Sequence, residues 1–411
     1  MRISLFKANG GEELCQKLAD SLNLWQDIFP EELDKLILIK PNLNSSLDAL
    51  TGNTTDLRIL SSLIKYLKDK GYKRIVIGEG YNSGFHRENI DVIKRNRVDK
   101  LAEYYNINVV DFNFSEGKEI ELENGIKTQI AKLCLEADFF INVPKLKMHF
   151  MTQMSVCLKS LIGALVGRRN KLLVHRNLSK NILRLNDVIK PNLFIVDGLI
   201  GMEGTGPSAG SPIKMDTVII GDNPYLIDLV CARLVGCEYH ELPVIKEAMD
   251  SGRITKEIID TANSVDIQKY YTYFKKPSPN FMAKLIIHPR YQKYFVAFRN
   301  LPLISPLLSN IHIRKILLSL GITQELVMHK ERNNSIFLND KLCDQCKQCR
   351  PFCPIFLKLP EDFHNAEKME HCIDCLYCFA ICPKQAIQVD GNLGYYKEQL
   401  SRYDKLIRGR L

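Results

Sequence analysis

The sequence predicts an α/β fold: a mostly parallel sheet with helices on both faces, then a helical linker segment and a small α+β domain. Three observations lead to this prediction. Short apolar runs alternate with a helical pattern through the first 263 residues. Residues 264–340 interrupt the alternation and hold eleven Lys and Arg against four Asp and Glu, most of the net charge of +9. Eight of the thirteen cysteines lie beyond residue 340. The expected domains are residues 1–263, 264–339 and 340–392, followed by a tail at 393–411.

The apolar runs of the first domain have the length and composition of buried parallel strands. Between two of them, residues 57–72 repeat leucine and isoleucine at helical spacing and reach a glycine stop at Gly71. The expected strands are residues 35–40, 74–80, 107–113, 137–147, 192–201 and 214–224. In such an alternation the crossovers are right-handed, and functional groups collect at the carboxyl ends of the strands.

Residues 264–339 mix aromatic residues, prolines and cations, and we expect short helices that link or brace the two domains. Two interpretations of the charge stay open: a solvated face, or contact with an acidic partner or an anionic membrane surface. Nucleic acid is not expected, because no binding motif accompanies the charge. No run of about 18 apolar residues predicts a membrane span, and residues 1–14 lack the apolar core of a signal peptide. We therefore expect a cytoplasmic protein.

Two cysteine runs carry the strongest chemical signal of the chain. "CDQCKQCRPFCP" (343–354) and "CIDCLYCFAICP" (372–383) share the spacing C-x2-C-x2-C-x3-C-P. Thiolates at this spacing wrap an iron–sulfur cube, and the fourth cysteine of each run ligates the other cluster. Zinc uses thiolates in pairs, and disulfides belong to oxidising compartments, so both alternatives fit poorly. We expect two [4Fe–4S] clusters, one on Cys343, Cys346, Cys349 and Cys382 and one on Cys353, Cys372, Cys375 and Cys378.

Over residues 340–392 this pattern resembles bacterial-type ferredoxins that carry two [4Fe–4S] clusters. Those proteins usually have glycine after the second cysteine, where this chain has Lys347 and Leu376. The departure affects the expected reduction potential more than the ligation. The five remaining cysteines are scattered, and we expect them to be buried small hydrophobes. Cys157 is close to Lys159, and a nearby cation can lower the pKa of a thiol.

Cation-capable side chains follow the expected strands of the first domain. Lys40 and Asn42 stand where residues 35–40 end, as ligand contacts or as a solvated lysine after a strand. If "NVPKLKMHF" (142–150) is extended, Lys145, Lys147 and His149 project to one face. These three groups repel one another, so they favour either solvent or a bound anion or metal.

A further group of cations follows an expected helix. In residues 154–177, an apolar stripe from Leu158 to Leu165 predicts a helix that contains Lys159 and ends at Gly167. Cations are favourable at a helix end, so part of the group that follows is structural. That group is Arg168, Arg169, Lys171 and His175.

Two glycine-rich stretches come after strands. "GEGYNSG" (78–84) nearly matches the dinucleotide motif, but its third glycine is one residue late, so a tight turn presenting Glu79 is expected instead of a NAD site. In "VDGLIGMEGTGPSAG" (196–210), Asp197 ends an apolar strand before a run of glycines that includes Gly204 and Gly206. Such a loop can bring backbone N–H groups to an anion, or it can be mobile without a ligand.

Over about residues 35–240 these stretches resemble the domain-of-unknown-function family 362. The resemblance rests on "KPNL", "INVPKLKMH", "CLKSLIGALVG", "VDGLIGMEGTGP" and "GDNPYLIDLVCARLVG". Family members commonly carry a ferredoxin-like module, but the family implies no general reaction. Ser160 departs from the pattern, since asparagine often follows the lysine there. The resemblance singles out Lys145, His149, Lys159, Lys171, His175, Asp197 and Asp228 as residues to test.

The first hypothesis on function is a reductase-type enzyme. A redox partner protein would supply electrons to the cluster module, which would pass them to a small anionic substrate in the α/β domain. Its candidate catalytic residues are His149, His175, Lys145 and Asp197. Its candidate substrate-binding residues are Lys40, Asn42, Lys147, Lys159, Lys171, Gly204 and Gly206. The alternatives are a non-enzymatic electron carrier or docking protein for a partner oxidoreductase, and a sensor of oxygen or iron.

Overall fold

The structure is a computed structural model that describes residues 1–82, 90–207, 209–278 and 332–397, with Phe85, Ile313, Gln399 and Leu400. Most of the basic linker segment and the residues after Leu400 lie outside the described residues. The expectations on their helices and partners therefore stay predictions. Nothing in the described part of the chain is a helix long and apolar enough to cross a membrane.

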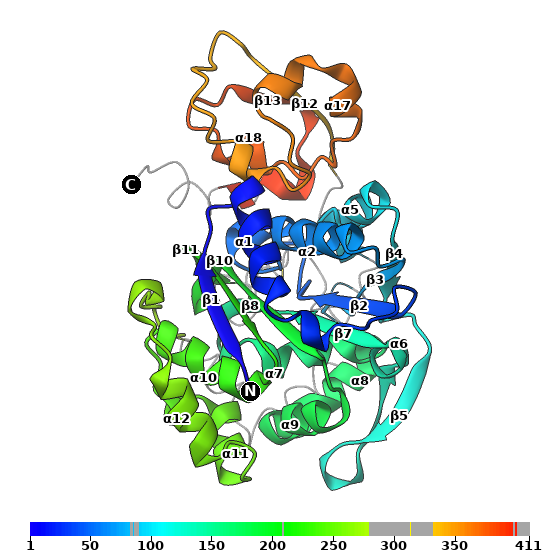
Figure 1. Ribbon diagram of the computed structural model, residues 1–411, viewed down its shortest axis with the longest axis vertical. Coiled ribbons are helices and arrows are strands. Elements are labelled where there is room, and N and C mark those ends of the chain that lie inside the picture. The colour runs from blue at the N-terminus through cyan, green and yellow to red at the C-terminus, as the bar shows by residue number, and fades with distance from the viewer. Residues whose placement is uncertain are drawn as a thin grey trace.

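One sheet of nine strands forms the centre of the described first domain (Figure 1). Its order is β1-β11-β10-β7-β2-β3-β4, and β8 and β9 extend it beside β10. Neighbouring pairs among β10, β7, β2, β3 and β4 are parallel, whereas β11 is antiparallel to both β1 and β10. The strands are β1 (Ile3–Lys7), β2 (Leu36–Pro41), β3 (Arg74–Glu79), β4 (Asn108–Asp111), β7 (Phe139–Val143), β8 (Lys145–His149), β9 (Gln153–Ser155), β10 (Leu193–Thr205) and β11 (Ala209–Gly221). The predicted mostly parallel α/β sheet is confirmed.

Helices cover both faces of this sheet, as predicted (Figure 1). In β2, Ile37 and Ile39 face a core with α1 and α2, while Leu38 between them faces the opposite core with α9. This alternation makes both faces apolar, as a doubly covered strand requires. The helices are α1 (Gly11–Asn23), α2 (Leu57–Asp69), α4 (Val92–Arg95), α5 (Val98–Tyr104), α6 (Leu133–Glu136), α7 (Cys157–Ser160), α8 (Gly167–Val174), α9 (Leu178–Val188), α10 (Pro224–Leu234), α11 (Pro243–Asp250), α12 (Lys256–Ser264), α17 (Ala366–Glu370) and α18 (Tyr377–Ile381).

Three predicted elements differ from the structure. The apolar run 137–147 is two strands, β7 and β8, because Pro144 interrupts it. The helix expected to end at Gly167 is only α7 and a 3-10 turn, and Gly167 begins α8 instead. Pairing with β6 (Lys127–Ala131) replaces the missing helical turns, since Leu165 bridges Ile130. The glycine-rich run 196–210 is part of the long β10–β11 hairpin.

The C-terminal module packs on α1 and α2 at one end of the molecule (Figure 1). It contains β12 (Asn333–Leu338) paired with β13 (Ile387–Asn392), while β5 (Gly117–Glu121) and β6 form a separate hairpin in the first domain. The contact with α1 is close: a Cβ on Gly10 would lie 2.3 Å from the backbone oxygen of Pro351. One hydrophobic core runs from α2 into the cysteine loops, so the module is docked on the sheet domain.

Candidate functional site

The eight cysteines of the C-terminal module form two groups. Cys343, Cys346, Cys349 and Cys382 line one hollow, which we call the outer site. Cys353, Cys372, Cys375 and Cys378 lie close enough to act on one another electrostatically, and we call them the inner site. Cys346 of the outer site is exposed, whereas Cys353 and Cys378 of the inner site are buried. The inner site lies against the first domain, because Cys375 lines a hollow together with Asp48 and Leu57.

The surroundings of both sites suit thiolate ligands. Burial raises the pKa of Cys353, but backbone hydrogen bonds from Leu357 and Ile355 oppose this rise by favouring the thiolate. The N–H of Ala386 donates to the Cys382 sulfur over 3.3 Å. Each iron of a [4Fe–4S] cube takes one thiolate, so the sulfurs surround a volume rather than a point. Consistently, no three His, Cys, Asp or Glu side chains in the described ranges converge on a single metal ion.

The two positions that depart from the ferredoxin pattern adopt an unusual backbone. Lys347 has φ of 59° and Leu376 has φ of 64°, the left-handed region that favours glycine. A side chain there costs about 1–2 kcal/mol. The departure from glycine therefore changes the strain of the loop, while the backbone conformation of these two positions remains left-handed.

Five lysines lie together where the parallel strands end, and we call them the lysine cluster: Lys40, Lys145, Lys147, Lys159 and Lys171. Lys40 is the second-last residue of β2, and Lys145 and Lys147 are on β8 next to β10. Carboxyl ends of parallel strands meet at one edge, which is why residues so far apart in sequence converge. All but Lys159 are at least nine-tenths buried, so the interpretation of these lysines as solvated is wrong.

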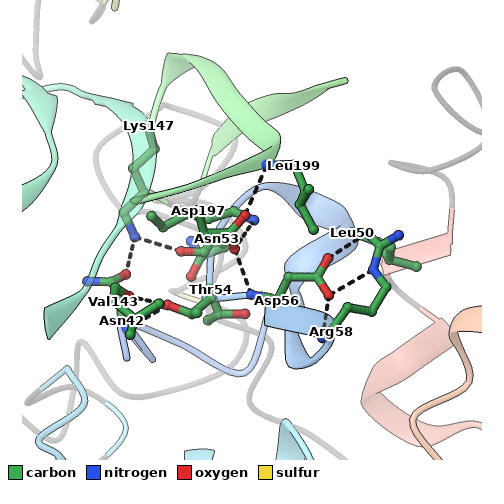
Figure 2. Close-up of polar contacts among 12 residues, drawn as sticks. Asn42, Leu50, Asn53, Thr54, Asp56, Arg58, Val143, Lys147, Asp197 and Leu199 are labelled. Atoms are coloured by element: carbon green, nitrogen blue, oxygen red, sulfur yellow. Dashed lines mark hydrogen bonds and ion pairs between the residues drawn. The ribbon is translucent and has the colours of Figure 1, made fainter. Parts of the chain in front are cut away.

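Lys145 is paired with a carboxylate. Its Nζ lies 2.8 Å from Oδ2 of Asp197, and both side chains are fully buried. Asp197 also accepts the backbone N–H groups of Asp56 and Leu199, over 2.7 and 3.0 Å (Figure 2). Asp197 therefore has an acceptor role in the fold that occupies both of its oxygens.

Lys40 and Lys171 are also held. Lys40 donates to Glu79 over 2.8 Å and to the backbone oxygen of Ser160 over 2.9 Å. Glu79 is thus presented at the end of β3, as expected, but inward rather than on a surface turn. A Cβ on Gly163 would lie 1.9 Å from Glu79, so this pair requires a glycine opposite it. Lys171 donates to Asn113 and to the Tyr81 backbone oxygen.

Lys147 has only neutral partners. Its Nζ donates to Oδ1 of Asn42 and to the backbone oxygen of Asn53, each over 2.7 Å (Figure 2). Burial and then the charge of Lys159 lower its pKa well below the usual lysine value. Asn42 is therefore at the site. It orients Lys147 through a hydrogen bond, but as a neutral side chain it does not compensate the positive charge of this lysine.

Lys159, on α7, has no carboxylate or hydrogen-bond acceptor within the part of the chain that the structure describes. Burial lowers its pKa to about 8. Its charge acts on both Lys147 and His149, which places three cation-capable groups together. Such a group is stable only when one loses its proton or an anion joins them.

The two histidines lie at this same place. His149 is buried, and its Nδ1 accepts the backbone N–H of Met151 over 3.1 Å, so its Nε2 carries the proton when the ring is neutral. Burial, then Lys159 and Lys147, lower the pKa of His149, and His175 contributes to this effect. His149 is thus neutral near pH 7 and can donate a hydrogen bond through Nε2.

Other candidates have structural positions. Gly204 and Gly206 belong to the β10–β11 hairpin, where Gly206 accepts a backbone hydrogen bond from Phe150 over 2.9 Å. Asp228, on α10, accepts the backbone N–H of Cys157 over 2.8 Å, and burial raises its pKa to about 7. Burial also raises the pKa of Cys157, so Lys159 does not activate this thiol. Ser160 accepts a hydrogen bond from Asn142 over 2.6 Å.

A buried ionic chain that sequence reasoning missed joins the inner site to the lysine cluster. The ring of Phe352, beside Cys353, lies 4.3 Å from the Arg58 guanidinium carbon. Arg58 donates twice to Asp56, over 2.7 and 3.0 Å, and the Asp56 N–H donates to Asp197 (Figure 2). Asp56 and Arg58 open α2, where an acidic residue is expected as an ordinary helix cap. Because acidic helix caps are common, the sequence did not indicate that Asp56 and Arg58 also connect the inner site to the lysine cluster.

Taken together, an α/β domain with a buried lysine cluster and a module with two cysteine sites define an iron–sulfur protein of two parts. A family model described as a domain of unknown function (DUF362) matches residues 37–233. A second, described as a 4Fe-4S dicluster domain, matches residues 335–383. The chain is thus similar to the DUF362 family over residues 37–233 and to 4Fe-4S dicluster domains over residues 335–383, and the second match supports an iron–sulfur electron-transfer role.

One curated relative is the thylakoid-associated protein sll1697 of Synechocystis sp. (strain ATCC 27184 / PCC 6803 / Kazusa). It is 25% identical over 222 residues, 51% of this chain and 65% of the relative, so the chain spans slightly under two thirds of that protein. The lactate racemase apoprotein of Thermoanaerobacterium thermosaccharolyticum matches 53% of each chain, at 16% identity and a TM-score of 0.37. A Thermotoga maritima protein matches 51% of this chain and 56% of its own, at 12% identity and a TM-score of 0.26. Likenesses this weak carry no information on function.

Proposed function

We propose that this chain is a reductase-type oxidoreductase in which electrons pass between the cluster domain and a small anion at the lysine cluster. The observation that supports this most is Lys159, which has no acceptor among the described residues and whose charge acts on Lys147 and His149. The ionic chain from the inner site reaches the same lysine cluster through Asp197 and Lys145. When bound, the clusters supply electrons one at a time. The proposal includes two [4Fe–4S] clusters, a redox partner protein and a cytoplasmic location.

The chemistry of the lysine cluster favours an anion of carboxylate or phosphate type. Lys147 and Lys159 offer charge-assisted donors, and neutral His149 offers one N–H through Nε2. Lys145 is already neutralised by Asp197, so its role is to hold Asp197 and the end of the ionic chain in place. His149 and His175 are the candidate proton donors to a reduced anion. Since burial and Lys159 lower the pKa of His149, this ring would donate as a neutral imidazole, through Nε2.

We expect Lys159→Met to weaken the binding of inorganic phosphate and of acetate at least tenfold. The variant removes a cation that has no acceptor among the described residues, and it keeps the length and the apolar stem of the side chain. Isothermal titration calorimetry with each anion measures the effect. The matched control is Arg169→Met, which removes an exposed cation ten residues further along the chain. Equal affinities in the two variants would contradict the site.

Anion binding is expected to weaken as pH rises through about 8. The pKa of Lys159 is about 8, so its ammonium is protonated below this pH and loses its proton above it. An anion binds the protonated form, so affinity falls by roughly tenfold per pH unit above the pKa. Calorimetric titration between pH 6.5 and pH 9.5, on either side of about 8, checks this expectation. Lys159→Met should show a smaller inflection at that point, because burial also lowers the pKa of Lys171 to about 8 and this lysine still titrates there.

Electron transfer to the anion distinguishes an enzyme from a carrier. The full chain is reduced anaerobically with dithionite, freed of excess, and mixed with carboxylate and phosphate compounds while the cluster absorbance is followed. Reoxidation that is lost in Lys159→Met supports the reductase. No reoxidation by any compound, with partner association that weakens as salt rises, would favour the carrier or docking protein instead.

A further inference from the structure

The inner cysteine site shares a hollow with the first domain. Cys375, Tyr377 and Tyr396 line this hollow from the module, and Asp48, Leu57 and residues 95–97 line it from the first domain. The hollow at the outer site is lined by residues of the C-terminal module alone. The two sites therefore have different electrostatic surroundings, although their cysteine spacing is the same.

Arg332 and Arg95 are two buried cations of the hollow at the inner site, and Arg332 is the one that belongs to the C-terminal module. Its side chain is 2% exposed, and its Nη2 lies 3.3 Å from Oδ2 of Asp374 and also donates to the Asp374 backbone oxygen. Its Nε and Nη1 are buried and have no acceptor among the described residues. A guanidinium stays charged in a protein, and buried donors without an acceptor are costly. These two N–H groups therefore indicate an acceptor that the described residues do not provide.

Cys375 of the inner site lines the same hollow as Arg332, so a sulfur at this site is the candidate acceptor. Hydrogen bonds to cluster sulfurs are among the factors that set the reduction potential. At the outer site, Lys347 and Lys384 are more than half exposed and pair with Glu361 and Asp344, so water and salt screen them.

We propose that Arg332 donates to a sulfur at the inner site and raises the reduction potential there above that of the outer site. Reduction adds one negative charge, which a buried cation stabilises strongly and an exposed lysine only weakly. Electrons that enter near the exposed Cys346 then collect at the inner site, beside Phe352 and Arg58. The inference rests on both sites holding [4Fe–4S] clusters, and it does not depend on the substrate.

The test is a redox titration of the full chain followed by electron paramagnetic resonance, with Arg332→Gln and Arg332→Lys compared with the unmodified protein. Cys346→Ser assigns the signals, because it alters the outer site alone. In Arg332→Gln the ratio of reduced to oxidised inner cluster at a fixed potential should fall at least tenfold, which is about 59 mV for one electron. Arg332→Lys keeps the charge but loses the planar fork, so its shift should be smaller.

Arg97→Gln is the matched control. Arg97 pairs with the same Asp374 over 2.9 Å, but its side chain is 22% exposed, so water and salt screen its charge. It should leave the inner potential within the error of the titration, and iron content confirms that each variant retains its clusters. The proposal is overturned if the inner site of the unmodified protein has the lower potential, or if Arg332→Gln with full iron leaves it unchanged. If Arg332→Gln loses iron, an unchanged potential in Arg332→Lys overturns it equally.

Discussion

Asp197→Ala is expected to destabilise the folded protein by about 3–5 kcal/mol. The substitution leaves the Lys145 ammonium fully buried without its carboxylate, and it leaves the Asp56 N–H without its acceptor. Desolvation of a lone ammonium costs far more than the loss of an exposed ion pair. Urea unfolding of the anaerobic full chain, followed by far-ultraviolet circular dichroism, measures the loss as a lower midpoint.

Two further variants separate charge from packing. The double variant Lys145→Met/Asp197→Leu removes both charges and should recover part of the lost stability, because a buried ion pair can be replaced by apolar side chains of similar size. Asp69→Ala breaks the exposed pair with Lys65 and should cost less than about 1 kcal/mol. If Asp197→Ala costs no more than Asp69→Ala, the pair does not have the role that its burial indicates.

The strands were predictable because buried parallel strands carry a simple signal. The runs 35–40, 74–80 and 107–113 match β2, β3 and β4 to within a few residues. The structure of residues 154–167 was not predictable in this way, because their apolar stripe suits a helix and also suits the bridge between Leu165 and Ile130. Local periodicity cannot show which of two competing hydrogen-bond partners a backbone will take.

The sequence predicted which residues form the site, but not which residues they pair with. Period-two alternation placed Lys145, Lys147 and His149 on one face, and the strand-end rule placed Lys40 near them. The pairing of Lys145 with Asp197 and of Lys40 with Glu79 depends on contacts between residues 52 and 39 positions apart. No spacing in the sequence reports such contacts, and the same is true of the arginines at the inner site.

Removing one inner ligand is expected to affect the fold more than removing one outer ligand. Cys378→Ala and Cys346→Ala should each lower the iron content from about eight to about four atoms per chain, since each takes one thiolate from one cluster. Cys378 is buried in the core that α1 and α2 share with the cysteine loops, whereas Cys346 is exposed. Loss of the inner cluster should therefore loosen the docking of the module as well. Iron analysis and the rate of limited proteolysis measure the two effects.

The two cysteine variants also locate the electron route. With the inner cluster gone, the Phe352–Arg58–Asp56 chain has no cluster at its outer end, so reoxidation by a bound anion should stop in Cys378→Ala. Cys346→Ala keeps the inner cluster, so reoxidation should persist while reduction by a protein donor slows, because the exposed entry site is gone. Full iron in both variants would show that these cysteines are not ligands. If both variants lose half of their iron but are digested at equal rates, the inner site does not stabilise the contact between the two domains. We expect unequal rates, because Cys378 lies in the core that the module shares with α1 and α2.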